Sequence, residues 1–283
     1  MKIKTVAIIG AGVMGSATAL HLARHGYRII LKDVRGKQLE KSQEMIKSQY
    51  RSTCMMLKSY QEVKLIDILN RISFQLDYSG FDSVELVIEN IDEKKSSKVA
   101  EYRKLSSVCN NKTYFAINTS CFSITYLAGL LPNPDKAIGL HFMNPVPMKK
   151  TVEVIRGVHT SMDAEKFMSN FLRTIDKKAI IINDMPGFVS NRLSHLLMNE
   201  AAFLVQNNVA KPAQVDSIMK LSFGHQMGPL ETADLIGLDT VVNSLNVLYE
   251  SYQDTKFRCC PLLKKMVAAG FYGCKTKKGF YEY

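Results

Sequence analysis

Apolar and polar residues follow two different periodicities along this chain. Up to about residue 183, short apolar runs such as VAIIG and VELVIE alternate with longer segments in which apolar residues recur every three or four positions. The short runs predict buried strands and the longer segments predict helices. We expect strands at residues 3–9, 27–32, 72–75, 84–89, 113–118, 137–142, 152–155 and 179–182. Strands that alternate with helices indicate a doubly wound α/β domain.

Helical spacing dominates two further parts of the chain. Residues 36 to about 70 are charged and apolar at helical spacing, which predicts a long helical hairpin inserted among the strands. After Asp184 the pattern is helical throughout, with Leu193, Leu197 and Ala201 on one face of a predicted helix. We therefore expect a strand-containing domain at residues 1–183 and an all-α domain at residues 184–283. The many apolar helix faces favour burial against a partner subunit, with a compact monomeric core as the alternative.

A glycine-rich turn follows the first predicted strand. It consists of Gly10, Ala11, Gly12, Val13, Met14 and Gly15, and a helix is expected from Ser16 to Arg24. In a Rossmann-type domain the first glycine permits a tight turn, the second lets a pyrophosphate approach the backbone, and the third lets helix and strand pack closely. The helix N-terminus offers unpaired N–H groups to the phosphates. A lone G-x-G-x-x-G is a weak signal, but its strand–turn–helix context here is the one that the motif requires.

An acid lies where such a domain binds the adenine ribose. Asp33 ends the second predicted strand, about 20 residues beyond the glycines. Its carboxylate would accept hydrogen bonds from the ribose hydroxyls and repel a 2′-phosphate, which favours NAD over NADP. Arg35 is close in sequence and keeps NADP as an open alternative.

A histidine and a glutamate are spaced for proton transfer. His141 ends one predicted strand, Glu153 lies 12 residues later on the next, and the connection contains Pro145 and Pro147. An antiparallel reversal near residue 147 would bring the two side chains together across neighbouring strands. A carboxylate behind an imidazole sets its tautomer and raises its basicity, as a general base requires. We expect His21 and His25, on the first helix, to be surface residues.

Two further polar residues are candidates for substrate binding. Ser120 follows a strand at the carboxyl edge of the sheet, where open α/β folds bind ligands, and Asn191 opens the helical part. A serine hydroxyl could hold a substrate oxygen and an asparagine amide could donate to a carbonyl. For either residue alone, a helix cap or a turn is the alternative.

Composition narrows the class of protein further. The net charge of +11 fits either a solvated basic surface or an anionic partner, but the basic residues are scattered, which disfavours nucleic acid. No apolar stretch reaches the length of about 18 residues that predicts a membrane-spanning helix. The six cysteines form no C-x-x-C pair, so we expect no metal, and reduced thiols in a cytoplasmic protein.

The chain resembles the short-chain L-3-hydroxyacyl-CoA dehydrogenases, of the 3-hydroxybutyryl-CoA dehydrogenase type. The matching stretches are VAIIGAGVMGSA, VIENIDE, INTSCFSIT, GLHFMNPVP, VEVIRG, PGFVSNR, MGPLETADLIGLD and GCKTKKGFYEY, which span nearly the whole chain in family order. The resemblance implies a Rossmann NAD-binding domain and a helical domain through which two subunits pair as a homodimer. It also implies NAD-dependent oxidation of the 3-hydroxyl of a short 3-hydroxyacyl-CoA to the 3-oxo compound, as in fatty-acid metabolism.

The resemblance also implies roles for individual residues. His141 would be the general base and Glu153 its orienting partner, while Ser120 and Asn191 would bind the substrate's 3-oxygen and the thioester region. The residues implied around NAD are Gly10, Ala11, Gly12, Val13, Met14, Gly15, Asp33, Glu93, Lys98, Ser120, Asn144 and Lys275.

One departure from the family pattern leaves the substrate carrier open. The family's helical hairpin usually has a lysine-rich turn that meets the coenzyme A nucleotide, but only Arg51, Lys58 and Lys64 remain here. A related group in antibiotic biosynthesis oxidises glyceryl or seryl units on an acyl carrier protein. Carrier proteins are acidic and would suit a basic surface. A carrier-bound substrate is therefore the alternative to coenzyme A.

Two other classes are less well supported. A non-catalytic protein on a dehydrogenase scaffold would not need Ser120, His141, Glu153 and Asn191, which are all present. A β-hydroxyacid dehydrogenase uses a lysine ahead of an asparagine for proton transfer, whereas Ser190 precedes Asn191 here.

Overall fold

The structure is a computed structural model that describes residues 3–119 and 122–283. It divides into two compact units, Met1–Asp184 and Met185–Tyr283. In the described part of the chain, no helix is both long and apolar enough to cross a bilayer.

The first unit is built on a single sheet of eight strands among the described residues, in the order β3-β2-β1-β4-β5-β6-β7-β8. The strands are β1 (Thr5–Ile9), β2 (Arg28–Lys32), β3 (Ile72–Gln75), β4 (Leu86–Glu89), β5 (Tyr114–Ile117), β6 (Ala137–Phe142), β7 (Thr151–Arg156) and β8 (Lys178–Asn183). Neighbours from β3 to β6 are parallel, β7 is antiparallel to β6, and β8 is parallel to β7. This confirms the expected α/β class and all eight expected strands.

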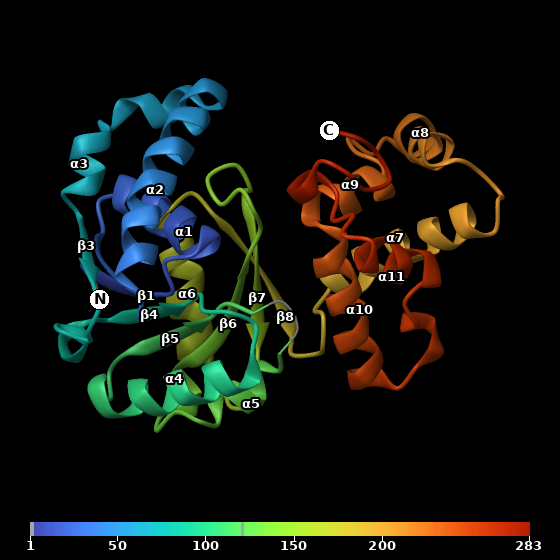
Figure 1. The fold of residues 1–283 in the computed structure, drawn as a ribbon. Helices are drawn as coiled ribbons and strands as arrows, with labels where there is room; N and C mark the ends of the chain where they lie inside the picture. The colour runs from blue at the N-terminus through green and yellow to red at the C-terminus, as the bar shows by residue number, and fades with distance from the viewer. Residues whose placement is uncertain (1–2, 120–121) are drawn as a thin grey trace. The chain divides into compact units, whose positions relative to one another are not determined.

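Helices cover both faces of the sheet (Figure 1). The helices of this unit are α1 (Val13–Arg24), α2 (Gly36–Met56), α3 (Leu65–Leu69), α4 (Lys95–Val108), α5 (Ile124–Ala128) and α6 (Met162–Thr174). One core combines α1 and α6 with the sheet, through residues such as Leu20, Ile88, Leu140 and Phe171. On the opposite face α4 buries Tyr102 and Leu105. The expected helical hairpin is present as α2, a short 3₁₀ helix and α3.

His21 is buried and the His25 side chain is only 10% exposed, which corrects the expectation that both lie on the surface. His21 is 3% exposed, and its ring nitrogens contact the Tyr60 hydroxyl at 2.6 Å and the Ile175 carbonyl oxygen at 2.9 Å. Burial, followed by the charge of Lys177, lowers the pKa of His21 well below its usual value. The imidazole is therefore a neutral link between α1, the hairpin and the end of α6, a role that helical periodicity alone cannot distinguish from exposure.

The second unit is helical, as the spacing after residue 184 predicts. Its helices are α7 (Ser190–Gln206), α8 (Pro212–Phe223), α9 (Pro229–Ile236), α10 (Leu238–Tyr252) and α11 (Pro261–Ala268). They enclose a separate core that includes Met198, Leu230, Leu245 and Leu263. This unit can therefore bury apolar surface independently of the sheet.

The C-terminal tail is tied to this core by Asp234, which is fully buried. The backbone N–H groups of Phe280 and Tyr281 each donate to its carboxylate at 3.0 Å, and the Tyr283 hydroxyl donates at 3.2 Å. Tyr281 also donates its hydroxyl to Asp216, at 2.7 Å. The tail is thus fixed by hydrogen bonds to buried acids, and Phe280 and Tyr281 also pack against this core.

Asp234→Ala is expected to lower the free energy of unfolding by about 2–4 kcal/mol, because two backbone N–H groups lose a buried acceptor. Urea denaturation followed by circular dichroism would measure this. Glu250→Ala, on the exposed face of α10, is the matched control and should change stability little. Equal stability of Asp234→Ala and the wild type would contradict the anchoring role.

Candidate active site

The loop between β1 and α1 has the backbone that a dinucleotide-binding turn needs. Gly10 has a φ of +91°, and a Cβ there would lie 2.5 Å from the Asn90 carbonyl oxygen. A Cβ on Gly15 would lie 1.8 Å from the Gly10 carbonyl oxygen, so only glycine lets α1 approach this closely. Around Gly12, by contrast, a Cβ would meet nothing within 4 Å. That open space is where the motif requires room for a pyrophosphate.

Asp33 is held beside this loop at the end of β2. One carboxylate oxygen accepts a hydrogen bond from the Ala11 N–H and the other from the Arg35 N–H, each at 3.0 Å. The residue is 7% exposed, whereas the Arg35 guanidinium, 3.7 Å away, faces solvent. An ionised carboxylate can accept about four hydrogen bonds. These two hydrogen bonds therefore leave a free lone pair on each oxygen. The acid is therefore oriented and still able to accept from ribose hydroxyls.

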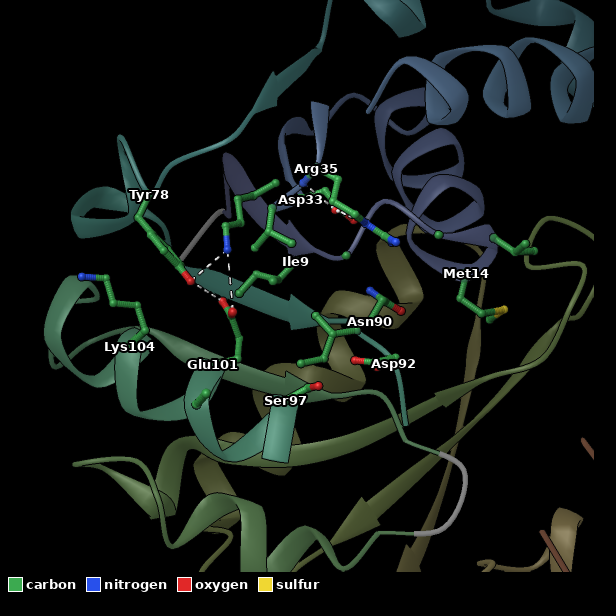
Figure 2. Close-up of a pocket in the computed structure, with 17 residues that line it drawn as sticks. Ile9, Met14, Asp33, Arg35, Tyr78, Asn90, Asp92, Ser97, Glu101 and Lys104 are labelled. Atoms are coloured by element: carbon green, nitrogen blue, oxygen red, sulfur yellow. Dashed lines mark hydrogen bonds and ion pairs between the residues drawn. The ribbon is translucent and has the colours of Figure 1, made fainter. Parts of the chain in front are cut away.

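A cavity of about 930 Å³ opens over these residues. Five of the predicted cofactor residues line it, namely Gly10, Gly12, Val13, Met14 and Asp33. The far wall is formed by residues 90–92, directly after β4, and by α4 (Figure 2). The volume falls within the range of small-molecule and cofactor sites. The open face of Gly12, the oriented carboxylate and the size of the cavity together fit NAD.

Alanine at the two glycines should separate cofactor binding from folding. Gly12→Ala places a methyl group in the open cavity, so we expect the Kd for NADH to rise roughly 10- to 100-fold with little change in unfolding temperature. Gly15→Ala forces the backbone of α1 away from Gly10, so we expect a lower unfolding temperature. Fluorescence titration and thermal unfolding measure the two quantities. NADH affinity unchanged in Gly12→Ala would contradict the placement of the pyrophosphate.

Lys98 and Glu93 form a charge network beside the cavity, and among the described residues neither lines it. The fully buried Lys98 ammonium donates to both carboxylate oxygens of Glu89, at 2.8 and 2.9 Å, and to the Asn118 carbonyl oxygen at 3.3 Å. It also lies 3.3 Å from Glu93, which accepts a hydrogen bond from the Thr119 hydroxyl. Burial raises the pKa of Glu89, and the Lys98 charge opposes that rise. Lys98 thus joins the ends of β4 and β5, while direct contact with NAD stays a prediction.

His141 and Glu153 are brought together by the turn after β6. They are directly opposite each other in the antiparallel β6–β7 register, and His141 Nδ1 is 2.8 Å from Glu153 Oε2. The residues are 7% and 8% exposed, respectively. This confirms the pairing expected from the spacing of 12 residues. With Glu153 ionised, Nδ1–H donates to the carboxylate, which orients Nε2 as the nitrogen able to take a proton.

The remaining predicted residues lie in separate places. Ser120 falls outside the described residues. Asn144 is exposed two residues after β6, with a cis peptide bond to Pro145. In the second unit, Asn191 lies in the first turn of α7, where its carbonyl oxygen is 2.9 Å from His195 Nδ1. Lys275 donates to Asp239 at 2.8 Å and to Thr240 at 2.9 Å.

The cavity also has lining residues that the sequence did not predict. Lys32, Tyr78 and Glu101 come from β2, from the loop after β3 and from α4. Of these three, only Lys32 has a local sequence signal for a binding site. It is a charged residue that directly follows the apolar run Ile29–Leu31 in β2. Tyr78 and Glu101 are distant in sequence from the glycine motif and give no local signal.

No cysteine of the described residues lines this cavity. The five cysteines in the described residues, Cys54, Cys109, Cys259, Cys260 and Cys274, are free. Burial raises the pKa of the Cys259 thiol to about 11, which makes it a poor nucleophile at neutral pH. No group of three or more metal-ligating side chains occurs among the residues described.

Known proteins match this chain over nearly its whole length. The NAD-binding domain model of 3-hydroxyacyl-CoA dehydrogenase matches residues 5–185, and the model of its C-terminal domain matches residues 187–283. A probable 3-hydroxybutyryl-CoA dehydrogenase of Bacillus subtilis is 40% identical, over 100% of this chain and 98% of its own length. The 3-hydroxybutyryl-CoA dehydrogenase of Clostridioides difficile is 38% identical, over 98% of this chain and 99% of its own length.

A solved structure gives the same result for the fold. The crystal structure of (S)-3-hydroxybutyryl-CoA dehydrogenase from Ralstonia eutropha matches with a TM-score of 0.92 and 34% identity, covering 100% of this chain and 99% of that one. The chain therefore belongs to the 3-hydroxyacyl-CoA dehydrogenase family and is an NAD-dependent oxidoreductase.

Proposed function

We propose that this enzyme oxidises the 3-hydroxyl group of a short-chain 3-hydroxyacyl-CoA, such as 3-hydroxybutyryl-CoA, to the 3-oxo thioester. The observation that carries the proposal is the 2.8 Å contact between His141 and Glu153. It provides an oriented imidazole on the same sheet as the cavity that fits NAD. The names of the relatives in Bacillus and Clostridioides support the substrate class.

His141 acts as the general base in this proposal. Its Nε2 accepts the proton of the 3-hydroxyl, and the electron pair left on oxygen forms the carbonyl as hydride leaves carbon 3. NAD, when bound, supplies the hydride acceptor. The imidazole becomes cationic, and the Glu153 carboxylate offsets that charge at 2.8 Å. Proton transfer of this kind typically contributes about 10²–10⁴ in rate.

The other predicted residues take supporting roles. Ser120 and Asn191 bind the 3-oxygen and the thioester region, and Asn144 and Lys275 contact NAD or its neighbourhood. We assign Lys98 a positioning role, because its ammonium already bonds the Glu89 carboxylate and the Asn118 carbonyl. From there it holds the loop that leads into Thr119, whose hydroxyl bonds Glu93.

The substrate is tested by following NADH formation with one hydroxyacyl group on two carriers. We expect higher kcat/KM with (S)-3-hydroxybutyryl-CoA than with the same group on a phosphopantetheinylated acyl carrier protein. The reverse order would establish the carrier-bound alternative. No NADH with either carrier would overturn the proposed reaction.

We also propose that the enzyme is a homodimer formed through the second unit. Leu193, Leu221, Phe223 and Leu235 are 65%, 86%, 68% and 57% exposed on its helices. Large apolar side chains that are exposed in a monomer can be covered when subunits associate. Light scattering should give twice the mass of the chain, and Leu221→Glu should shift the equilibrium toward the monomer.

We place the dimer in the cytoplasm, where free thiols stay reduced.

A further inference from the structure

A chain of polar contacts closes one end of the cofactor cavity. Lys32 Nζ donates to the Tyr78 hydroxyl at 2.9 Å, and this hydroxyl donates to Glu101 at 2.7 Å. Lys32 Nζ also lies 3.7 Å from the other oxygen of Glu101. Figure 2 shows Tyr78 and Glu101 facing each other on one side of Asp33, with Met14 on the other side. We call Lys32, Tyr78 and Glu101 the end-wall trio.

Lys32 and Glu101 are largely removed from water, and Tyr78 is half-buried. The Lys32 side chain is 2% exposed and that of Glu101 is 11% exposed. Burial, and then the Glu101 carboxylate, raises the pKa of Tyr78, so its hydroxyl stays protonated and donates a hydrogen bond to Glu101. Because an ammonium can only donate and a carboxylate can only accept, the hydrogen bonds run from Lys32 to Tyr78 to Glu101.

Hydrogen-bonding capacity remains at both ends of the trio. The Lys32 ammonium has three N–H donors, and one is used on Tyr78. The second Glu101 oxygen is beyond hydrogen-bond distance of Lys32. A desolvated ion pair with incomplete hydrogen bonds is costly, so a ligand that completes them is favoured. The wall thus presents a carboxylate acceptor beside an ammonium donor.

The direction of a dinucleotide along the cavity places its base at this wall. A pyrophosphate belongs at the glycine loop near Met14 and a ribose belongs at Asp33. The base then extends beyond Asp33, toward the trio. Adenine presents its N6 amino donors beside a ring nitrogen acceptor. This is the complement of Glu101 and Lys32.

We propose that the end-wall trio recognises the edge of the adenine base, with Glu101 accepting from the N6 amino group and Lys32 donating to a ring nitrogen. This makes Glu101 and Lys32 specificity-determining residues for the cofactor. The proposal rests on the assignment of the cavity to NAD. Hypoxanthine carries an oxygen acceptor in place of the amino group, so it would face the Glu101 carboxylate with like partial charge.

The test compares the Kd of NADH with that of reduced nicotinamide hypoxanthine dinucleotide, by calorimetry or nicotinamide fluorescence without substrate. A hydrogen bond to a charged group predicts that the wild type binds NADH about tenfold or more tightly. Glu101→Gln should bring the ratio of the two Kd values (hypoxanthine dinucleotide over NADH) close to one, because the amide can also donate to the hypoxanthine oxygen. Tyr78→Phe, which removes the bridging hydroxyl, should lower the ratio as well.

Asp92→Asn is the matched control, because Asp92 lines the same cavity and loses the same charge. It should keep the wild-type ratio. Equal Kd values for the two dinucleotides in the wild type would overturn adenine recognition while leaving the NAD site intact. A ratio that falls equally in Asp92→Asn and Glu101→Gln would overturn it too, because net charge would then explain the preference. Failure of both dinucleotides to bind would overturn the cofactor site itself.

Discussion

His141→Gln is expected to lower kcat by about 10²–10⁴ while the Kd for NADH stays close to that of the wild type. Glutamine has similar size and can still donate to Glu153, but it cannot take the proton of the 3-hydroxyl. Steady-state kinetics with 3-hydroxybutyryl-CoA, together with fluorescence titration of NADH, would separate the chemical step from cofactor binding.

The control is His159→Gln, because His159 is an exposed residue of the same unit. It should retain full activity. Substantial turnover by His141→Gln would rule out His141 as the base, and a parallel loss of NADH affinity would instead indicate a structural defect. Glu153→Gln should give an intermediate loss in kcat, because the imidazole remains but its charge is no longer offset.

Asp33→Ala is expected to raise the Kd for NADH by about 10- to 100-fold, since hydrogen bonds to a charged acceptor are lost. The Kd for NADPH should rise less, because the carboxylate that repels a 2′-phosphate is also removed and Arg35 remains. The preference for NADH over NADPH therefore falls. Fluorescence titration with both cofactors measures it.

The carboxylate also orients the glycine loop, through its bond from the Ala11 N–H at 3.0 Å. Asp33→Asn keeps an acceptor oxygen for that bond, so it separates loop order from loss of charge. Asp82→Ala, at an exposed position outside the cavity, is the control. An unchanged cofactor preference in Asp33→Ala would show that another residue excludes NADP.

Several features followed from the sequence because they depend on local order along the chain. The strand before Gly10 and the helix after it are set by short-range periodicity and by glycine conformation. Strand β3 and strand β6 have the predicted bounds. The His141–Glu153 pair was predictable for the same reason, because a short reversal between adjacent strands determines which residues lie opposite each other.

Helix α6 also has local signals in its sequence. The expected elements include no helix at α6, although Ser161 caps it by accepting from the Ala164 N–H at 3.2 Å. Asp163 and Glu165 follow in its first turn, and Arg173 lies in its last. An N-cap serine with acids after it and a base at the far end is an established helix signature.

The sequence by itself determined the α/β and helical parts, the dinucleotide turn and the histidine–glutamate pair, because each arises from residues that are near one another in the chain. Only the tertiary structure decided that His21 is buried, that Lys98 joins β4 to β5, and that Lys32, Tyr78 and Glu101 form one wall. These contacts bring together side chains from elements far apart in sequence. Periodicity reports which face of an element is apolar, and it contains no information on which distant polar group a buried charge will meet.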